Sequence, residues 1–265
     1  MSKIKTIRSV VLLIIGLLLT GLAHQAWAVD GVVLINQSNA LAGNVTPGDA
    51  PGFPVTISQP GSYQLSSNLV VSDPAVDAIL ITVNGVTLNL NGFTITGPGT
   101  GTGIGIHGAP VGGYPSTSDT VVSNGKVTNF GSHGIQFDSD NRIEGVQSFG
   151  NGGEGIHVSN GNILLKNNVF NNASNGIHIG NASILIGNVV AVNGRKGIVE
   201  GYSGDPATGS LIKDNVITRN TGLGLDLAAD SGYANNVLTK NHSGGSQVQG
   251  GVQIGQNLCG TSLCP

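Results

Sequence analysis

The sequence predicts an all-β solenoid, a single-stranded parallel β-helix of about eight stacked coils. Three observations point to it. The first is composition: 43 of the 265 residues are Gly, 39% are hydrophobic and only 9% are charged. So much Gly disfavours long helices, and a chain this apolar and weakly charged does not have the composition of a disordered protein. The other two observations are internal repeats, one of Gly-Ile pairs and one of Asn residues.

The Gly-Ile pairs recur every 21 residues and begin at Gly134, Gly155, Gly176 and Gly197. Related pairs extend this series on both sides and begin at Ala78, Gly105, Gly224 and Gly251. The runs after each pair are short and rich in β-branched residues, without the 3.6-residue period of a helix. Each repeat therefore predicts three short strands that make one coil.

Two columns of Asn follow the same spacing. One column consists of Asn151, Asn172, Asn193, Asn220 and Asn241, and the other of Asn167, Asn188, Asn215 and Asn236. Coil stacking places equivalent residues about 4.8 Å apart, so inward-facing Asn side chains are expected to form an amide ladder. Asn also tolerates a left-handed backbone at turns, and Gly suits corners where a Cβ would obstruct the bend.

The first 28 residues have the three parts of a secretory signal peptide. Lys3, Lys5 and Arg8 form a basic start, residues 10–22 are apolar, and Ala26-Trp27-Ala28 offers a cleavage site after Ala28. The apolar run is short for a membrane span. We therefore expect a secreted or periplasmic protein that has no membrane partner after cleavage.

Charge argues against nucleic acid as a partner. Without the leader the chain carries eight basic and fourteen acidic residues, a net charge of −6, and no basic cluster. Proteins that bind nucleic acid rely on basic patches that neutralise phosphates.

Beyond the leader we expect two segments, an N-terminal cap or linker at residues 29–56 and the β-helix domain at residues 57–265. Caps are expected because the open ends of a solenoid would otherwise expose strand edges. Cys259 and Cys264 are the only cysteines. In an oxidising compartment they are expected to close a small C-terminal loop as a disulfide, with a metal-binding pair as the alternative.

The repeated pattern from Gly134 to Asn241 resembles the right-handed parallel β-helix proteins of pectin-lyase-like fold. Segments near both ends are similar to secreted bacterial members of that group, namely residues 56–65 (TISQPGSYQL), 86–95 (VTLNLNGFTI) and 257–265 (NLCGTSLCP). The resemblance, with the general preference for right-handed parallel crossovers, implies a right-handed helix. It does not select an activity, because this fold hosts lyases, hydrolases, epimerases, adhesins and binding proteins, so the function has to be argued from the site.

Two longer repeats suggest where a ligand binds. Extra residues fall at 108–120 and 201–210, after the same strand of the coil, and each insertion contains a Tyr, Tyr114 or Tyr202. We expect these insertions to form the walls of a shallow cleft. Strand alternation predicts that Ile135, Phe137 and their equivalents point inward, and that the cleft floor consists of His107, Gln136, Asp138, His157, Ser159 and His178.

Aromatic walls above a polar floor suit an oligosaccharide, because sugar rings stack on aromatic side chains and hydroxyls bond to planar polar groups. The sequence therefore predicts a module that binds polysaccharide or cell-envelope glycan, without catalysis. One alternative is a polysaccharide lyase or epimerase acting on uronic-acid polymers, with Asp138 and His157 as acid and base. Another is a surface scaffold or adhesin without a small ligand.

No metal and no cofactor are predicted. His157 and His178 would stack as two imidazoles, but a stable metal site needs three or four ligands. The oligomeric state stays open at this level.

Overall fold

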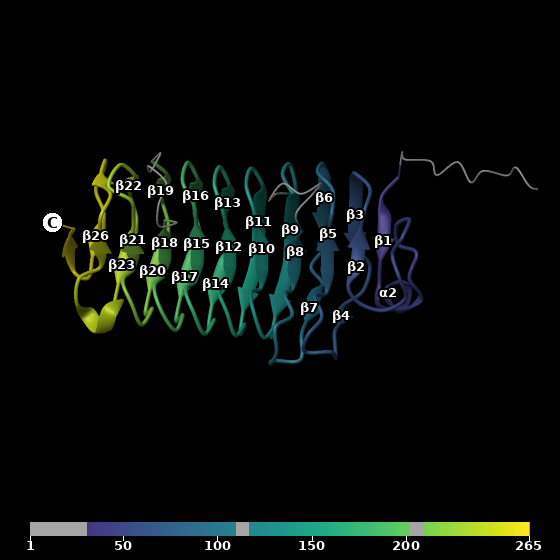
Figure 1. Cartoon of the computed structure of the whole chain (residues 1–265). Coiled ribbons are helices and arrows are strands. Elements are labelled where there is room, and N and C mark those ends of the chain that lie inside the picture. The colour runs from purple at the N-terminus through teal and green to yellow at the C-terminus, as the bar shows by residue number, and fades with distance from the viewer. Residues whose placement is uncertain (1–30, 110–116, 202–208, 265) are drawn as a thin grey trace, which may run out of the picture. The chain divides into compact units, whose positions relative to one another are not determined.

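The computed structural model describes residues 31–109, 117–201 and 209–264. The predicted leader, Tyr114 and Tyr202 therefore lie outside the described residues. From Val32 onward the strands stack coil upon coil as a parallel β-helix (Figure 1). Within the described residues, no helix has the length and apolar character needed to cross a membrane.

The described strands form two sheets, which we call sheet I and sheet II. Sheet I has nine strands among these residues, one from each successive coil: β2 (Val55–Ile57), β5 (Ile79–Ile81), β8 (Ile106–Gly108), β10 (Ile135–Phe137), β12 (Ile156–Val158), β15 (Ile177–Ile179), β18 (Ile198–Glu200), β21 (Leu225–Asp226) and β24 (Val248–Gln249). The prediction of about eight coils is close to this number.

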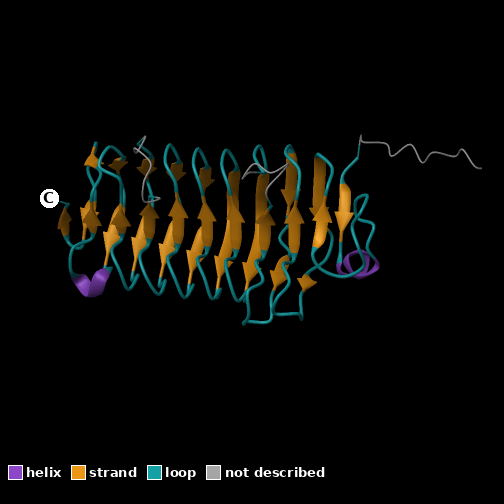
Figure 2. Cartoon of the chain, in the orientation of Figure 1, coloured by secondary structure: helices purple, strands orange, loops and turns teal. Residues whose placement is uncertain are grey.

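Sheet II takes up the rest of each coil and has eighteen strands in the described part of the chain (Figure 2). They are β1 (Val33–Ile35), β3 (Gly61–Leu65), β4 (Leu69–Val70), β6 (Val86–Asn89), β7 (Thr94–Thr96), β9 (Val121–Thr128), β11 (Arg142–Phe149), β13 (Ile163–Leu165), β14 (Asn168–Phe170), β16 (Ile184–Ile186), β17 (Val189–Ala191), β19 (Leu211–Lys213), β20 (Val216–Thr218), β22 (Gly232–Ala234), β23 (Val237–Thr239), β25 (Val252–Gln253), β26 (Leu258–Cys259) and β27 (Ser262–Leu263).

The Gly-Ile repeat sets the register of sheet I. Ile135 pairs with Ile156, Ile156 with Ile177 and Ile177 with Ile198, all in parallel. The side chains of these four Ile residues are fully buried. The residues two positions later, Phe137, Val158, Ile179 and Glu200, are also buried, and the residue between is partly exposed. The predicted alternation of inward and outward residues along these strands is confirmed.

The Gly of each repeat occupies a corner that has no room for a side chain. A Cβ on Gly176 would lie 2.4 Å from Val190 Cγ1 and 2.6 Å from Asn193 Nδ2, and one on Gly155 would lie 2.3 Å from Val169 Cγ1. Contacts this short do not occur between real atoms. The Gly residues that were expected at tight corners are therefore required by packing.

Both Asn columns form the expected ladders inside the solenoid. Asn167 Nδ2 donates to Asn188 Oδ1 at 3.1 Å, and the same contact continues from Asn188 to Asn215 at 2.9 Å. The backbone N–H of each Asn donates to the same oxygen as its Nδ2. Both ladders thus hold buried backbone and side-chain groups in hydrogen bonds.

The left-handed turn residue is not the ladder Asn. The residue before it adopts positive φ instead, as Lys166 (φ 53°), Asn171 (φ 54°), Val192 (φ 58°) and Asp214 (φ 57°) do. The expectation that the column Asn itself uses its tolerance for this conformation was wrong. The ladder needs the Asn side chain directed inward, so the preceding residue makes the bend.

The two ends are closed by different elements. At the N-terminal end β1 pairs in parallel with β3, and the short helix α2 (Gln37–Ala42) follows it, with Asn36 Oδ1 accepting from the N–H of Asn39. At the C-terminal end the 3₁₀ turn η1 (His242–Gly244) precedes the last coil, and β26 pairs with β27 in antiparallel fashion. The disulfide Cys259–Cys264 closes the loop between these strands.

Candidate functional site

A row of polar side chains lies on the outer face of sheet I. His107, Gln136, His157 and His178 occupy equivalent positions in β8, β10, β12 and β15, because their strands pair in register. All four are partly exposed. These four of the six residues predicted for the cleft floor thus form a continuous row, which Val199 and Asp226 extend along β18 and β21.

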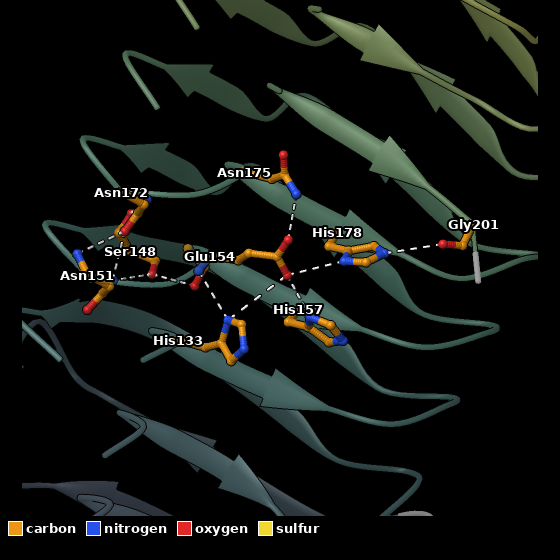
Figure 3. Close-up of polar contacts among 10 residues, drawn as sticks. His133, Ser148, Asn151, Glu154, His157, Asn172, Asn175, His178 and Gly201 are labelled. Atoms are coloured by element: carbon orange, nitrogen blue, oxygen red, sulfur yellow. Dashed lines mark hydrogen bonds and ion pairs between the residues drawn. The ribbon is translucent and has the colours of Figure 1, made fainter. Parts of the chain in front are cut away.

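Glu154, which was not among the predicted site residues, lies beside this row, between His133, His157 and His178 (Figure 3). Its Oε2 accepts hydrogen bonds from Nδ1 of His157 at 2.6 Å and from Nδ1 of His178 at 3.2 Å. His133 Nδ1 lies 4.0 Å from the same oxygen. One carboxylate therefore joins three histidines that come from three successive coils.

Glu154 belongs to a second column, formed by the residue just before the Gly of each repeat. His133, Glu154, Asn175 and Lys196 occupy this column at intervals of 21 residues. Asn175 Oδ1 accepts the backbone N–H of Lys196 at 3.1 Å, which turns Nδ2 toward Glu154, where it donates to Oε1 at 2.6 Å. Glu154 and His133 were not predicted, but the sequence contains the signal for them: both stand directly before the Gly of a 21-residue repeat.

Burial and charge set the ionisation of the cluster. Burial raises the pKa of Glu154, but the hydrogen bonds from His157, His178 and Asn175 outweigh it and hold that pKa well below its usual range. Burial lowers the pKa of His178, and here the bond to Glu154 and its negative charge prevail and raise it. For His133 burial is the largest influence, and nearby His157 adds to it, so its pKa is lowered. The cluster thus favours the ionised form of Glu154, shifts His133 toward its neutral form and shifts His178 toward its charged form.

The cluster also has the composition of a metal site. Each of His133, Glu154 and His157 offers one nitrogen or oxygen ligand atom, and these atoms lie within 4.8 Å of one another. Imidazole and carboxylate together suit first-row transition metals. His107, at the start of the row, lies apart from this cluster and contacts a single carboxylate, Asp77, at 2.8 Å.

The remaining predicted site residues are less closely connected. Asp138 follows β10, and its Oδ1 lies 3.4 Å from Ser139 Oγ, while Ser159 follows β12 and donates its backbone N–H to the carbonyl oxygen of Asp138. Asp138 and Ser159 are both partly exposed and lie directly after β10 and β12. The two Tyr that were expected to form walls, Tyr114 and Tyr202, lie outside the described residues.

A cationic pocket adjoins the cluster. It has a volume of about 440 Å³ and is lined by Asn175, Gly194, Arg195, Lys196, Thr221, Gly222 and His242. Lys196 forms an ion pair with Asp226, whereas Arg195 has no ion pair within the described ranges. A second pocket, of about 300 Å³, lies near Tyr233 and the disulfide and has no charged side chain in its lining. Of these two pockets, only the first has charged side chains in its lining.

Comparison with known proteins agrees with this architecture. Residues 114–258 match the family described as the right handed beta helix region, so the chain belongs to that family. No curated protein sequence matches significantly.

Among solved structures, a point mutant of the periplasmic alginate epimerase AlgG aligns with a TM-score of 0.54 at 18% identity, over 75% of this chain and 50% of that one. The A-module of the Azotobacter vinelandii mannuronan C-5 epimerase AlgE4 aligns with a TM-score of 0.55 at 15% identity, over 80% of this chain and 67% of that one. The chain thus spans about half the length of AlgG. At these identities the likeness shows a common fold.

Proposed function

We propose that this chain is an exported β-helix protein that binds an acidic polysaccharide across the outer face of sheet I, next to the pocket at Arg195. The disulfide Cys259–Cys264 fits an oxidising compartment outside the cytoplasm. The observation that carries the proposal is the cationic pocket beside a row of imidazole and amide groups. Such a surface offers a positive charge for a uronate carboxylate and planar polar groups for sugar hydroxyls.

Arg195 is the residue on which the acidic preference depends. Lys196 is already paired with Asp226, so most of its charge is compensated. The exposed Arg195 guanidinium can donate two parallel hydrogen bonds to a carboxylate, which is geometrically more specific than a single contact. In an otherwise acidic protein this local positive charge would attract a polyanion to one place.

The test is titration calorimetry with oligomannuronate and oligogalacturonate, and with a neutral glucan of equal length. We expect the acidic chains to bind and Arg195→Gln to weaken that binding by about 10- to 100-fold, the usual value of a charge-assisted hydrogen bond. Lys213→Gln is the matched control, because Lys213 lies on sheet II and pairs with exposed Asp214. Equal binding of the neutral glucan, or unchanged binding by Arg195→Gln, would contradict the proposal.

The His157–Glu154 contact favours a second candidate, an epimerase or lyase acting on the same polymers. A carboxylate that orients an imidazole on an accessible face is an arrangement that can remove a proton from a sugar acid. The aligned AlgG and AlgE4 structures are epimerases of alginate and mannuronan, which makes these polymers the first substrates to assay. Exchange of the sugar C5 proton in heavy water, followed by NMR, would reveal epimerisation, and formation of an unsaturated product would reveal a lyase. If neither occurs while binding persists, the binding module is supported.

A further inference from the structure

The cluster around Glu154 has more metal-ligating atoms than the carboxylate needs for its own stabilisation. Three imidazoles approach one oxygen, at 2.6, 3.2 and 4.0 Å. The acid Asp77 contacts a single imidazole, that of His107, and its other oxygen accepts the backbone N–H of Ile104. The convergence of His133, Glu154 and His157 is therefore the feature to explain.

The ligand atoms are in suitable chemical states. Glu154 offers a carboxylate oxygen, and only 8% of its side chain is exposed. Histidine binds a metal through a neutral ring nitrogen. Nδ1 of His133 carries no proton in this arrangement, because it accepts the backbone N–H of Glu154 at 3.1 Å, and its lone pair becomes available to a metal when the ring turns away from that amide.

Neighbouring groups hold the carboxylate in place. Asn175 Nδ2 donates to Oε1, which leaves Oε2 directed at the imidazoles. His178 bridges Oε2 and the carbonyl oxygen of Gly201, with distances of 3.2 and 3.4 Å, so both of its nitrogens have a polar neighbour (Figure 3). Partners of this kind commonly orient the ligands of metal sites from outside the coordination sphere.

We propose that His133, Glu154 and His157 bind one first-row divalent transition metal such as Zn²⁺, with a fourth position open toward solvent. Two nitrogens and one oxygen are a common ligand set for zinc, and three protein ligands with one open position are typical of accessible zinc sites. The open position faces the solvent side of sheet I, because 23% of the His133 side chain and 18% of the His157 side chain are exposed.

Binding requires a modest rearrangement. With metal–ligand distances of about 2.0–2.2 Å, ligand atoms in a tetrahedral site lie roughly 3.3–3.6 Å apart. Glu154 Oε2 and His157 Nδ1, now 2.6 Å apart, must separate, whereas His133 Nδ1, now 4.0 Å from the same oxygen, must approach it. The imidazole of His133 would turn from the Glu154 amide toward the ion, and the proton between His157 and Glu154 would be released.

The experiment uses the purified protein without a polyhistidine tag, stripped with a chelator and titrated calorimetrically with Zn²⁺. We expect one site per chain, with the affinity at least about 10-fold weaker in each of His133→Gln, Glu154→Gln and His157→Gln. His107→Gln is the matched control, because it removes an imidazole from the same row that has only one carboxylate partner. This variant should bind Zn²⁺ as the unaltered protein does.

A second measurement on the unaltered protein covers the case in which a variant does not fold. On addition of Zn²⁺, the imidazole ¹⁵N resonances of His133 and His157 should shift at one equivalent, while those of His107 and His242 stay in place. The proposal is overturned if the unaltered protein binds no Zn²⁺, if the first ion shifts His107 or His242 and leaves His133 and His157 in place, or if a folded Glu154→Gln or His133→Gln variant keeps the full affinity. None of these measurements involves a polysaccharide, so the result is independent of the proposed function.

Discussion

Asn167 and Asn188 are 21 residues apart in sequence, and one oxygen of Asn188 accepts two hydrogen bonds from Asn167. The backbone N–H of Asn167 lies 2.9 Å from Asn188 Oδ1 and its Nδ2 lies 3.1 Å away. Asn188 Nδ2 in turn donates to the carbonyl oxygen of Leu164 at 2.9 Å. A single side chain thus satisfies three buried groups on neighbouring coils.

Replacing Asn188 by Ala should therefore destabilise the protein strongly. The change leaves two donors and a carbonyl oxygen without partners in the interior, and each unsatisfied group costs about 1–3 kcal/mol. We expect a loss of about 3 kcal/mol or more, measured as a lower urea midpoint. Asn168→Ala is the control, because Asn168 lies in β14 with a partly exposed side chain. Equal effects of the two changes would contradict a special role for the ladder.

Gly176→Ala should also destabilise the protein, for a steric reason. The added Cβ would lie 2.4 Å from Val190 Cγ1 and 2.8 Å from the carbonyl oxygen of Gly197, so a backbone shift between coils is unavoidable. Overpacking of this kind costs about 1–3 kcal/mol. Thermal unfolding followed by circular dichroism measures the effect. Gly31→Ala should leave the melting temperature unchanged, since no atom lies within 4 Å of its Cβ position.

The Glu154 cluster should make stability depend on pH in the metal-free protein. The pKa of Glu154 is lowered in the fold, so its stabilising contribution is complete above its unfolded pKa, about 4.5, and is lost as the pH falls below that. The pKa of His178 is raised, so its contribution is complete below its unfolded pKa, about 6.5, and is lost as the pH rises through the folded value. The pKa of His133 is lowered, so His133 acts in the opposite sense: it destabilises the fold as the pH falls below its unfolded pKa, about 6.5.

Comparison with Glu154→Gln isolates the carboxylate, because burial of His133 is common to both proteins. The difference in melting temperature between the unaltered protein and Glu154→Gln should be largest between about pH 4.5 and 6.5 and decrease on either side. A difference that does not change with pH would mean that the bonds from His157 and His178 do not depend on charge.

The disulfide should contribute modestly and locally. Cys259 and Cys264 are five residues apart, and closing so short a loop stabilises a protein by about 2 kcal/mol in the chain-entropy description. We expect the double change Cys259→Ser and Cys264→Ser to cost about that much in a denaturant titration. Limited proteolysis should then cleave near β26 and β27 before the central coils. Early cleavage at β12 or β15 instead would show that the loop supports the whole solenoid.

The fold could be predicted from the sequence because a solenoid repeats the same pattern of short strands and turns in every coil. A period of 21 residues between Gly134, Gly155 and Gly176 specifies both the coil length and the register, since a shift by one residue would place Ile in solvent and His in the core. The same reasoning gave the Asn ladders. It misassigned the left-handed residue of the turn, because composition shows which residues tolerate that conformation but not which neighbour adopts it.

Only part of the site could be predicted from the repeat. Strand alternation places His157 and His178 on the outer face, and this needs only the sequence. The contact between Glu154 and His178 joins residues 24 positions apart on different coils, at 3.2 Å. That distance depends on the lateral offset of the coils and on the Asn175 bond that turns the carboxylate toward the rings.

The sequence by itself determined that this protein is a stack of coils, because the repeat gives identical residues identical neighbours along the axis. Only the tertiary structure decided that an acid and three histidines meet at one point of that stack. The reason is physical: the positions of Cα atoms follow from the period, whereas the direction of a partly buried carboxylate follows from the hydrogen bonds that its surroundings offer.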